Sequence, residues 1–174
     1  MSHDQLEFLH YWEKARERTR RLVPLIPADR LEWAPGPAGP TGESRFTCGD
    51  LVRHLAAAER WMFAENVCGR PSRYPGHGTE LARGRDAVLA LHDHLHGEAM
   101  EIFRGLDEAQ LAARCPTPGG VTIPAWKWLR SMVEHEAHHR GQLYLHLSLL
   151  GIATPPLYGL TSEEVRARSV VIDA

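Results

Sequence analysis

The amino-acid sequence predicts an all-α protein built as a four-helix bundle. Four long segments carry apolar residues at the three- and four-residue spacing of a helix, and clusters of glycine and proline separate them. No segment shows the convincing alternation of a strand. The 174 residues are 43% hydrophobic and 24% charged, as is typical of a soluble globular protein. We expect a single domain over residues 1–174, with its core in about 3–151 and an irregular tail in 152–174.

The first helix is expected over about residues 3–25. Pro24 and Pro27 end it, because proline cannot continue a helix. A loop over 31–46 follows, with six breakers: Pro35, Gly36, Pro37, Gly39, Pro40 and Gly42. In this first helix, over about residues 3–25, one edge of the apolar face carries Leu9, Trp12, Arg16, Thr19 and Val23.

The second helix is expected over about residues 47–68. Thr47 can cap its first turn, and Asp50, three residues further on, completes a capping-box pattern. Gly69 and Pro71 end the helix, and a polar connection follows. The connections after the first and second helices are both long enough to cross the bundle, so the order of helix directions stays open.

The third helix is expected over about residues 79–106, and a turn region rich in glycine and proline over 115–122. Its apolar residues recur at helical spacing: Leu81, Val88, Leu95, Ala99, Ile102 and Leu106.

The fourth helix is expected to begin at Thr122 or Pro124, because proline suits the first helical turn. It extends to Leu150, and Gly151 is its expected C-cap. A short helical turn is expected in the tail, over 162–168.

Histidines stand out: the chain has 11 of them. His135 and His139 lie four residues apart, so they share one face of the fourth helix, and that face is apolar. His54 points inward on the apolar face of the second helix. A bundle can bring these two faces together. Three imidazole ligands suit zinc, nickel, iron or copper and leave one coordination position of the ion free for water or substrate. The alternative is that they are core histidines bonded to backbone carbonyls or carboxylates.

Other residues near these faces have less defined roles. His146 also points inward and is expected either to perturb the site or to act as a fourth ligand. Glu65 and Gln142 lie on the histidine-bearing faces, where they either contact substrate, orient a ligand or form a polar rim. We expect His138 to flank the site and Arg140 to form a structural salt bridge. Three further histidines are expected on a solvated face of the third helix: His92, His94 and His96.

Composition excludes several classes of protein. Twenty Lys and Arg against 22 Asp and Glu leave a net charge of −2, which disfavours a nucleic-acid binder. Three cysteines without CxxC spacing suggest neither a disulfide framework nor a zinc ribbon. No secretory signal or membrane span is evident. We therefore expect a cytoplasmic protein.

Two segments resemble the DinB/YfiT-like family of metal-binding four-helix bundles. The fourth-helix string 135–143 is similar to the family's HxxxHRGQ signature, and 50–55 to its first histidine element. The resemblance covers about residues 6–150. It implies a bundle, often dimeric, with a divalent metal on His54, His135 and His139. Arg140 and Gly141 follow His139, unlike the HxxxHxE of the related sulfoxide synthases.

The resemblance also implies an activity. Some relatives look like transferases that use a low-molecular-weight thiol such as bacillithiol or mycothiol. The leading hypothesis is therefore a metal-dependent S-transferase-like enzyme acting on a small molecule, with zinc as the first expectation and nickel or iron as the others. The alternatives are a metal-dependent hydrolase of small esters or amides and a non-enzymatic, stress-associated metal-binding dimer. No catalytic acid or base is identifiable, and we expect a homodimer without nucleic-acid or membrane partners.

Overall fold

The computed structural model describes residues 2–36 and 45–170, and over these residues the chain is mostly helical. The expected all-α class is confirmed. The four long helical segments are α1 (His3–Arg20), α2 with α3 (Cys48–Ala58 and Ala64–Val67), α4 (Arg85–Gly105) and α6 (Ala125–Leu149). Shorter helices are α5 (Glu108–Ala112) and α7 (Ser162–Arg168). Four of the expected loop breakers, Pro37, Gly39, Pro40 and Gly42, lie outside the described residues.

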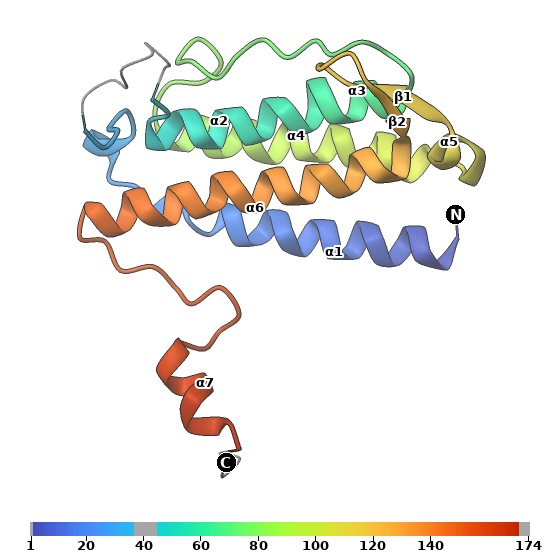
Figure 1. Ribbon diagram of the computed structural model, residues 1–174. Coiled ribbons are helices and arrows are strands. Elements are labelled where there is room, and N and C mark those ends of the chain that lie inside the picture. Colours follow the sequence, from blue (N-terminus) through green and yellow to red (C-terminus); the bar gives the residue numbers. More distant parts are fainter. Residues whose placement is uncertain (1, 37–44, 171–174) are drawn as a thin grey trace.

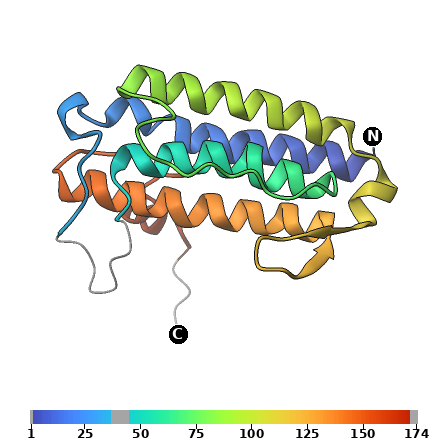
Figure 2. The same ribbon diagram turned by 90° about the horizontal axis from the view of Figure 1, so that it is seen from above.

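The long helices pack side by side, and α7 stands apart from them in the tail (Figure 1). Helix α2 contacts α4 and α6, and α1 contacts the same two helices. Helices α2 and α4 run in the same direction, so the connection between them returns along the whole length of the bundle (Figures 1 and 2). This connection, over residues 68–84, is a crossover, and it brings loop residues to the surface of α2. None of the helices in the described part is long and apolar enough to cross a membrane.

Several helix boundaries differ from the expected ones. Helix α1 ends at Arg20, and the chain continues as a tighter 3₁₀ turn, Val23–Leu25, that contains Pro24. Helix α4 begins at Arg85, not at residue 79, because Gly84 precedes it with a φ of +82° that a helix cannot contain. The apolar Leu81 extends the helical spacing across this break. The capping box of Thr47 and Asp50 and the helical turn in the tail are confirmed.

A two-stranded antiparallel hairpin was not expected. It pairs β1 (Arg114–Pro116) with β2 (Thr122–Pro124), with Cys115 opposite Ile123. The strands have three residues each, which is too short for alternation to be recognised in a sequence. The hairpin lies between α5 and the start of α6, and the backbone N–H of Ala125 donates to the carbonyl of Ala113 beside it.

The second helical segment contains a π-helical turn, η3 (Glu59–Phe63), between α2 and α3. A π-turn holds more residues than an α-turn, so it rotates everything beyond it relative to the expected helical positions. His54 lies before this turn and Glu65 after it. The turn therefore breaks the shared face on which the sequence placed both residues.

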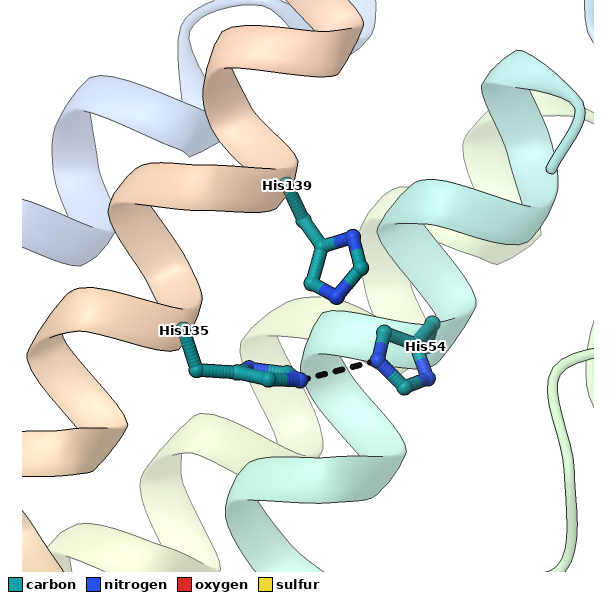
Figure 3. A group of neighbouring side chains, drawn as sticks. All are labelled: His54, His135 and His139. Carbon is teal, nitrogen blue, oxygen red and sulfur yellow. Dashed lines mark hydrogen bonds between the residues drawn. The ribbon is translucent and has the colours of Figure 1, made fainter.

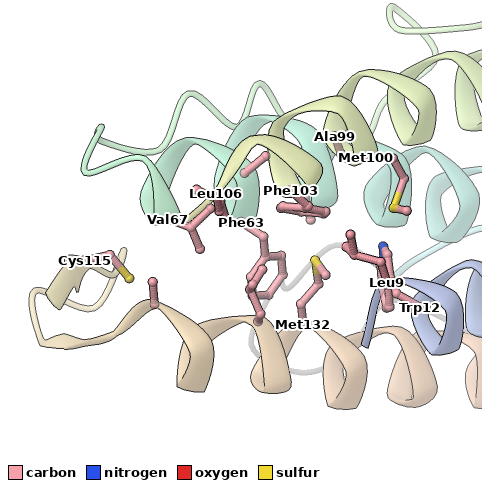
Figure 4. Close-up of a cluster of buried hydrophobic side chains, with 14 of the residues drawn as sticks. Leu9, Trp12, Phe63, Val67, Ala99, Met100, Phe103, Leu106, Cys115 and Met132 are labelled. Carbon is pink, nitrogen blue, oxygen red and sulfur yellow. The ribbon is translucent and has the colours of Figure 1, made fainter. Parts of the chain in front are cut away.

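Two apolar clusters fill the bundle. The larger one lies toward the end that carries the hairpin and includes Trp12, Phe63, Phe103 and Met132, all at most 2% exposed (Figure 4). The other lies toward the opposite end, around Leu22, Leu51 and Leu143. Burial of such side chains is the main favourable contribution to the stability of the bundle.

A buried charge network joins the helices. Arg16 of α1 donates from Nη1 to Glu136 of α6 at 2.8 Å, and its Nε lies 3.1 Å from Glu59 of η3 without hydrogen-bond alignment. Trp12 and His96 bond the same Glu59 carboxylate, from 2.6 and 2.8 Å. The three charged side chains are at most 2% exposed. Charges are rarely buried to this degree unless they are paired.

The expectation of a solvated His92 is wrong: this side chain is 1% exposed. It shares the inner face of α4 with Val88, Leu95 and Ala99, at spacings of three and four residues. Its Nδ1 lies 3.2 Å from the carboxylate of Asp93. His94 is 69% exposed, as expected, whereas His96 is largely buried against Glu59.

Candidate metal centre

Three histidines from two helices meet between α2 and α6. His54 projects from α2, and His135 and His139 project from successive turns of α6 (Figure 3). The ring centroids form a nearly equilateral triangle with sides of 4.8, 4.5 and 4.6 Å. One nitrogen of each ring lies within 4.8 Å of the other two. The structure therefore brings together the three residues that the sequence selected.

Local structure positions His54. The capped first turn of α2 fixes the start of the helix, and the adjacent Leu51 and Leu55 are buried in the bundle. The crossover adds a second constraint, because the Tyr74 hydroxyl lies 2.6 Å from His54 Nδ1 and 3.0 Å from His77 Nδ1. This arrangement is satisfied when His54 donates from Nδ1 and the hydroxyl donates on to His77. The lone pair of His54 is then on Nε2, which faces His135.

Gln142 positions His139 in the same way. Its side-chain oxygen lies 2.7 Å from His139 Nδ1, and an amide oxygen only accepts, so His139 carries its proton on Nδ1. The Nε2 lone pair is left for a ligand. The amide nitrogen of Gln142 lies 3.3 Å from His138 Nε2, which places His138 at the flank of the site, as expected. Of the roles open for Gln142, the structure favours orientation of a histidine.

Burial and mutual repulsion keep the histidines uncharged. Desolvation, with His135 and His139 nearby, lowers the pKa of His54 to about 3. Desolvation and His139 lower the pKa of His135 to about 4. Burial also lowers the pKa of His139. All three imidazoles are neutral at pH 7, which is the form that binds a metal ion.

The donor set fits a divalent transition-metal ion. Imidazole nitrogens bound to one zinc ion at about 2.0–2.1 Å lie a little over 3 Å apart in tetrahedral geometry. The Nε2 atoms of His54 and His135 are 2.9 Å apart. The outer ring nitrogens of His54 and His139 are held by Tyr74 and Gln142, as is usual for metal-binding histidines. A partly buried cluster of neutral imidazoles, two of them oriented by a partner, differs from three separately satisfied core histidines.

Phe46 covers one side of the cluster. Its ring centroid lies 5.0 Å from that of His54, 5.3 Å from that of His139 and 4.5 Å from that of His77. Sequence periodicity could not have identified Phe46, Tyr74 or His77, because all three lie in connections between helices. Of these three residues, the sequence hinted only at His77, because the chain is unusually rich in histidine.

The remaining predicted residues lie elsewhere. His146 is not part of the cluster; its Nδ1 lies 3.9 Å from the thiol of buried Cys48. Glu65 is not near the cluster either: beyond the π-turn it accepts from three arginines, Arg60, Arg70 and Arg73. These arginines lower the pKa of Glu65 to about 2, although burial alone would raise it. The salt bridge expected of Arg140 is not found among residues 2–36 and 45–170; its guanidinium donates to the backbone carbonyl of Ala15.

Comparison with known proteins identifies the family. The model of the DinB superfamily matches residues 11–143. None of the curated proteins matches the sequence. Among solved structures, a DinB-like protein from Bacillus subtilis has a TM-score of 0.70 at 20% identity, over 89% of this chain and 99% of that chain. A DinB-like protein from Bacillus cereus ATCC 10987 has a TM-score of 0.69 at 18% identity, over 86% and 94%.

A mycothiol-dependent maleylpyruvate isomerase has the same fold. Its TM-score is 0.61 at 20% identity, over 82% of this chain and 63% of that chain. At these identities the solved structures show the shared fold alone. The family match covers most of the chain, including the three clustered histidines. On this match the chain belongs to the DinB superfamily.

Proposed function

We propose that this protein is a metal-dependent enzyme of the thiol S-transferase-like class, acting on a small molecule with a low-molecular-weight thiol of the bacillithiol or mycothiol type. Its divalent ion is held by His54, His135 and His139. One observation carries the proposal: three neutral imidazoles converge on one point, and the outer nitrogens of two of them, His54 and His139, are already held. Zinc is the first expectation, because three histidines with an open position are typical of catalytic zinc; nickel and iron also accept imidazole.

We expect the reaction at the coordination position of the metal ion that the three histidines leave free. A divalent ion held by His54, His135 and His139 would lower the pKa of a thiol or water in its remaining coordination position and so supply a nucleophile at neutral pH. Tyr74 and Gln142 keep the protons of His54 and His139 on Nδ1, which leaves the Nε2 lone pairs of both rings to hold the ion. Phe46 shields one side of the cluster from water. The choice of a thiol as the nucleophile is supported by the mycothiol-dependent isomerase that shares this fold.

Elemental analysis of the purified, untagged protein is the first test. We expect about one zinc, nickel or iron ion per chain in the wild type. The ion should be lost in His54→Ala and His139→Ala, whose circular dichroism should keep the helical signal. His94→Ala is the matched control, because His94 is also a bundle histidine but 69% exposed on α4. Retention of stoichiometric metal by both site variants would refute the ligand assignment.

Turnover assays then distinguish the reaction classes. With the metal-loaded protein we expect conversion of electrophilic small molecules only when bacillithiol or mycothiol is present. Ester or amide turnover without any thiol would contradict transfer and indicate metal-dependent hydrolysis. Tightly held metal with four protein ligands and no turnover would contradict both enzymatic functions. The homodimer stays a prediction that sedimentation velocity can measure.

A further inference from the structure

A groove of about 320 Å³ lies beside the histidine cluster. It is formed by the chain before α2 and by the second half of α6, and its walls are Pro35, Arg45, Phe46, Gln142, Leu145 and His146. Two of these residues also contact the cluster: Gln142 bonds His139, and Phe46 packs on His54 and His139. The groove and the cluster are therefore neighbours with common walls.

His146 is the unusual member of the groove. The side chain is 6% exposed, and its Nδ1 lies 3.9 Å from Cys48 Sγ. Burial raises the pKa of the Cys48 thiol to about 11, so the thiol keeps its proton and can donate it to Nδ1. Burial also lowers the pKa of His146, which favours a neutral ring. With the thiol as the donor to Nδ1, that neutral ring carries its own proton on Nε2. Among the described residues, the one hydrogen-bonding contact of the His146 ring is that of Nδ1 with Cys48, so Nε2 has no partner there.

Arg45 supplies a second set of donors. Its guanidinium is exposed, and within the described residues it makes one long contact, at 3.5 Å, to the carbonyl of Pro35. No carboxylate from the described residues pairs with it. The groove thus combines a cation and the unpaired N–H donor of a largely buried ring with apolar walls from Phe46 and Leu145. This combination suits a molecule with an anionic oxygen at one end and an apolar body.

We propose that the groove binds the carboxylate of a small organic acid, which is the acceptor substrate of the enzyme. Arg45 and His146 Nε2 donate to the carboxylate, and the carbon skeleton packs on Phe46 and Leu145. The proposal rests on the proposed function, because it places this acid next to the metal-binding cluster. His146 lies seven residues after His139 on α6, or about 10 Å of helix rise. A carboxylate held there leaves the other end of a short acid directed along α6 toward the cluster.

The test is a nuclear magnetic resonance titration with benzoate, and with benzamide as a neutral probe of the same shape. It is performed on ¹⁵N-labelled protein, both metal-free and zinc-loaded. We expect benzoate to shift amide signals of residues 142–148 in both states, and benzamide to bind at least 5-fold more weakly. Arg45→Gln should weaken benzoate binding about 10-fold, the effect typical of losing a charge-assisted hydrogen bond. Arg45→Lys should restore part of the affinity.

Two further variants control the result. Arg130→Gln, at the other end of α6, removes an exposed arginine and should leave benzoate affinity unchanged. His146→Gln, which keeps a side-chain donor, should bind benzoate more tightly than His146→Leu, and unchanged amide spectra elsewhere show that both fold.

Equal affinities of wild type and Arg45→Gln would overturn the proposal. So would shifts that require zinc, because the carboxylate would then be on the ion. Benzoate binding to a protein that takes up no metal would refute the proposed function and leave the groove standing.

Discussion

Removal of the buried guanidinium of Arg16 should destabilise the bundle far more than removal of a surface arginine. Arg16 pairs with Glu59 and Glu136, and all three side chains are at most 2% exposed. In Arg16→Met the two carboxylates stay buried and lose the guanidinium that both share, while Trp12 and His96 still contact Glu59. Breaking a buried pair from one side typically costs about 3–5 kcal/mol. For a chain of this length that corresponds to a fall in Tm of roughly 6–20 °C.

The control is Arg20→Met, one helical turn away. Arg20 pairs with Asp93, but the two side chains are 44% and 39% exposed, so the expected loss is about 0–1 kcal/mol. Urea unfolding of the metal-free proteins, followed by circular dichroism, measures both free energies. If the two variants lost the same free energy of unfolding, the buried ion pairs of Arg16 would contribute no more to stability than the exposed pair of Arg20, and the reasoning would be refuted.

The pH dependence tests the cause. In the wild type, burial alone would raise the pKa of Glu59, but Arg16, His96 and Trp12 lower it below its ordinary value. Without Arg16, burial dominates and this pKa rises above that of the unfolded chain. A group with a raised folded-state pKa loses its stabilising contribution as the pH rises through that value. The penalty in Arg16→Met should therefore be larger at pH 7.5 than at pH 5.

Three further predictions concern the metal site and the core. Tyr74→Phe removes the partner of His54 Nδ1 and should weaken zinc binding about 10- to 100-fold in a chelator competition, whereas Tyr144→Phe, which loses only a bond to a tail carbonyl, should not. Because the pKa values of His54 and His135 are lowered to about 3 and 4, protons compete for these nitrogens only below about pH 5. Bound zinc should stay constant from pH 8 to 5, and a release midpoint near 6.5 would contradict this. Phe103→Ala, at a 1% exposed core position, should lower the free energy of unfolding by about 3–5 kcal/mol in the same urea assay. A loss below about 1 kcal/mol would show that the surrounding core closes the cavity left by the ring.

The sequence predicts the helices well where spacing, caps and breakers agree. Helix α6 and the capped start of α2 are examples, since proline or a capping box marks each of them. The errors occur where the backbone departs from the regular α-helix. The π-turn η3 rotates Glu65 away from its expected face, and Gly84 ends a helical pattern that the apolar residues continue. Neither departure changes the hydrophobic spacing that the prediction uses.

The candidate site divides in the same way. His54, His135 and His139 could be found because each lies on the apolar face of a regular helix, where an imidazole is conspicuous. Tyr74, His77 and Phe46 complete the surroundings from connections, whose path no periodicity describes. His92 was misplaced because a residue at the edge of an apolar stripe becomes buried when a neighbouring helix packs there. Its burial depends on tertiary contacts that one helix cannot report.

The separation of the histidines along the chain links metal binding to the order of folding. His54 and His135 are 81 residues apart, and α6 is the last of the four long helices to be synthesised. A growing or shortened chain that lacks α6 has only one of the three histidines. A metal ion at the proposed site would therefore bind only the closed bundle, and at 100 times its Kd it would stabilise that state by about 2.7 kcal/mol. Occupancy of the proposed site would therefore report that α2 and α6 have docked.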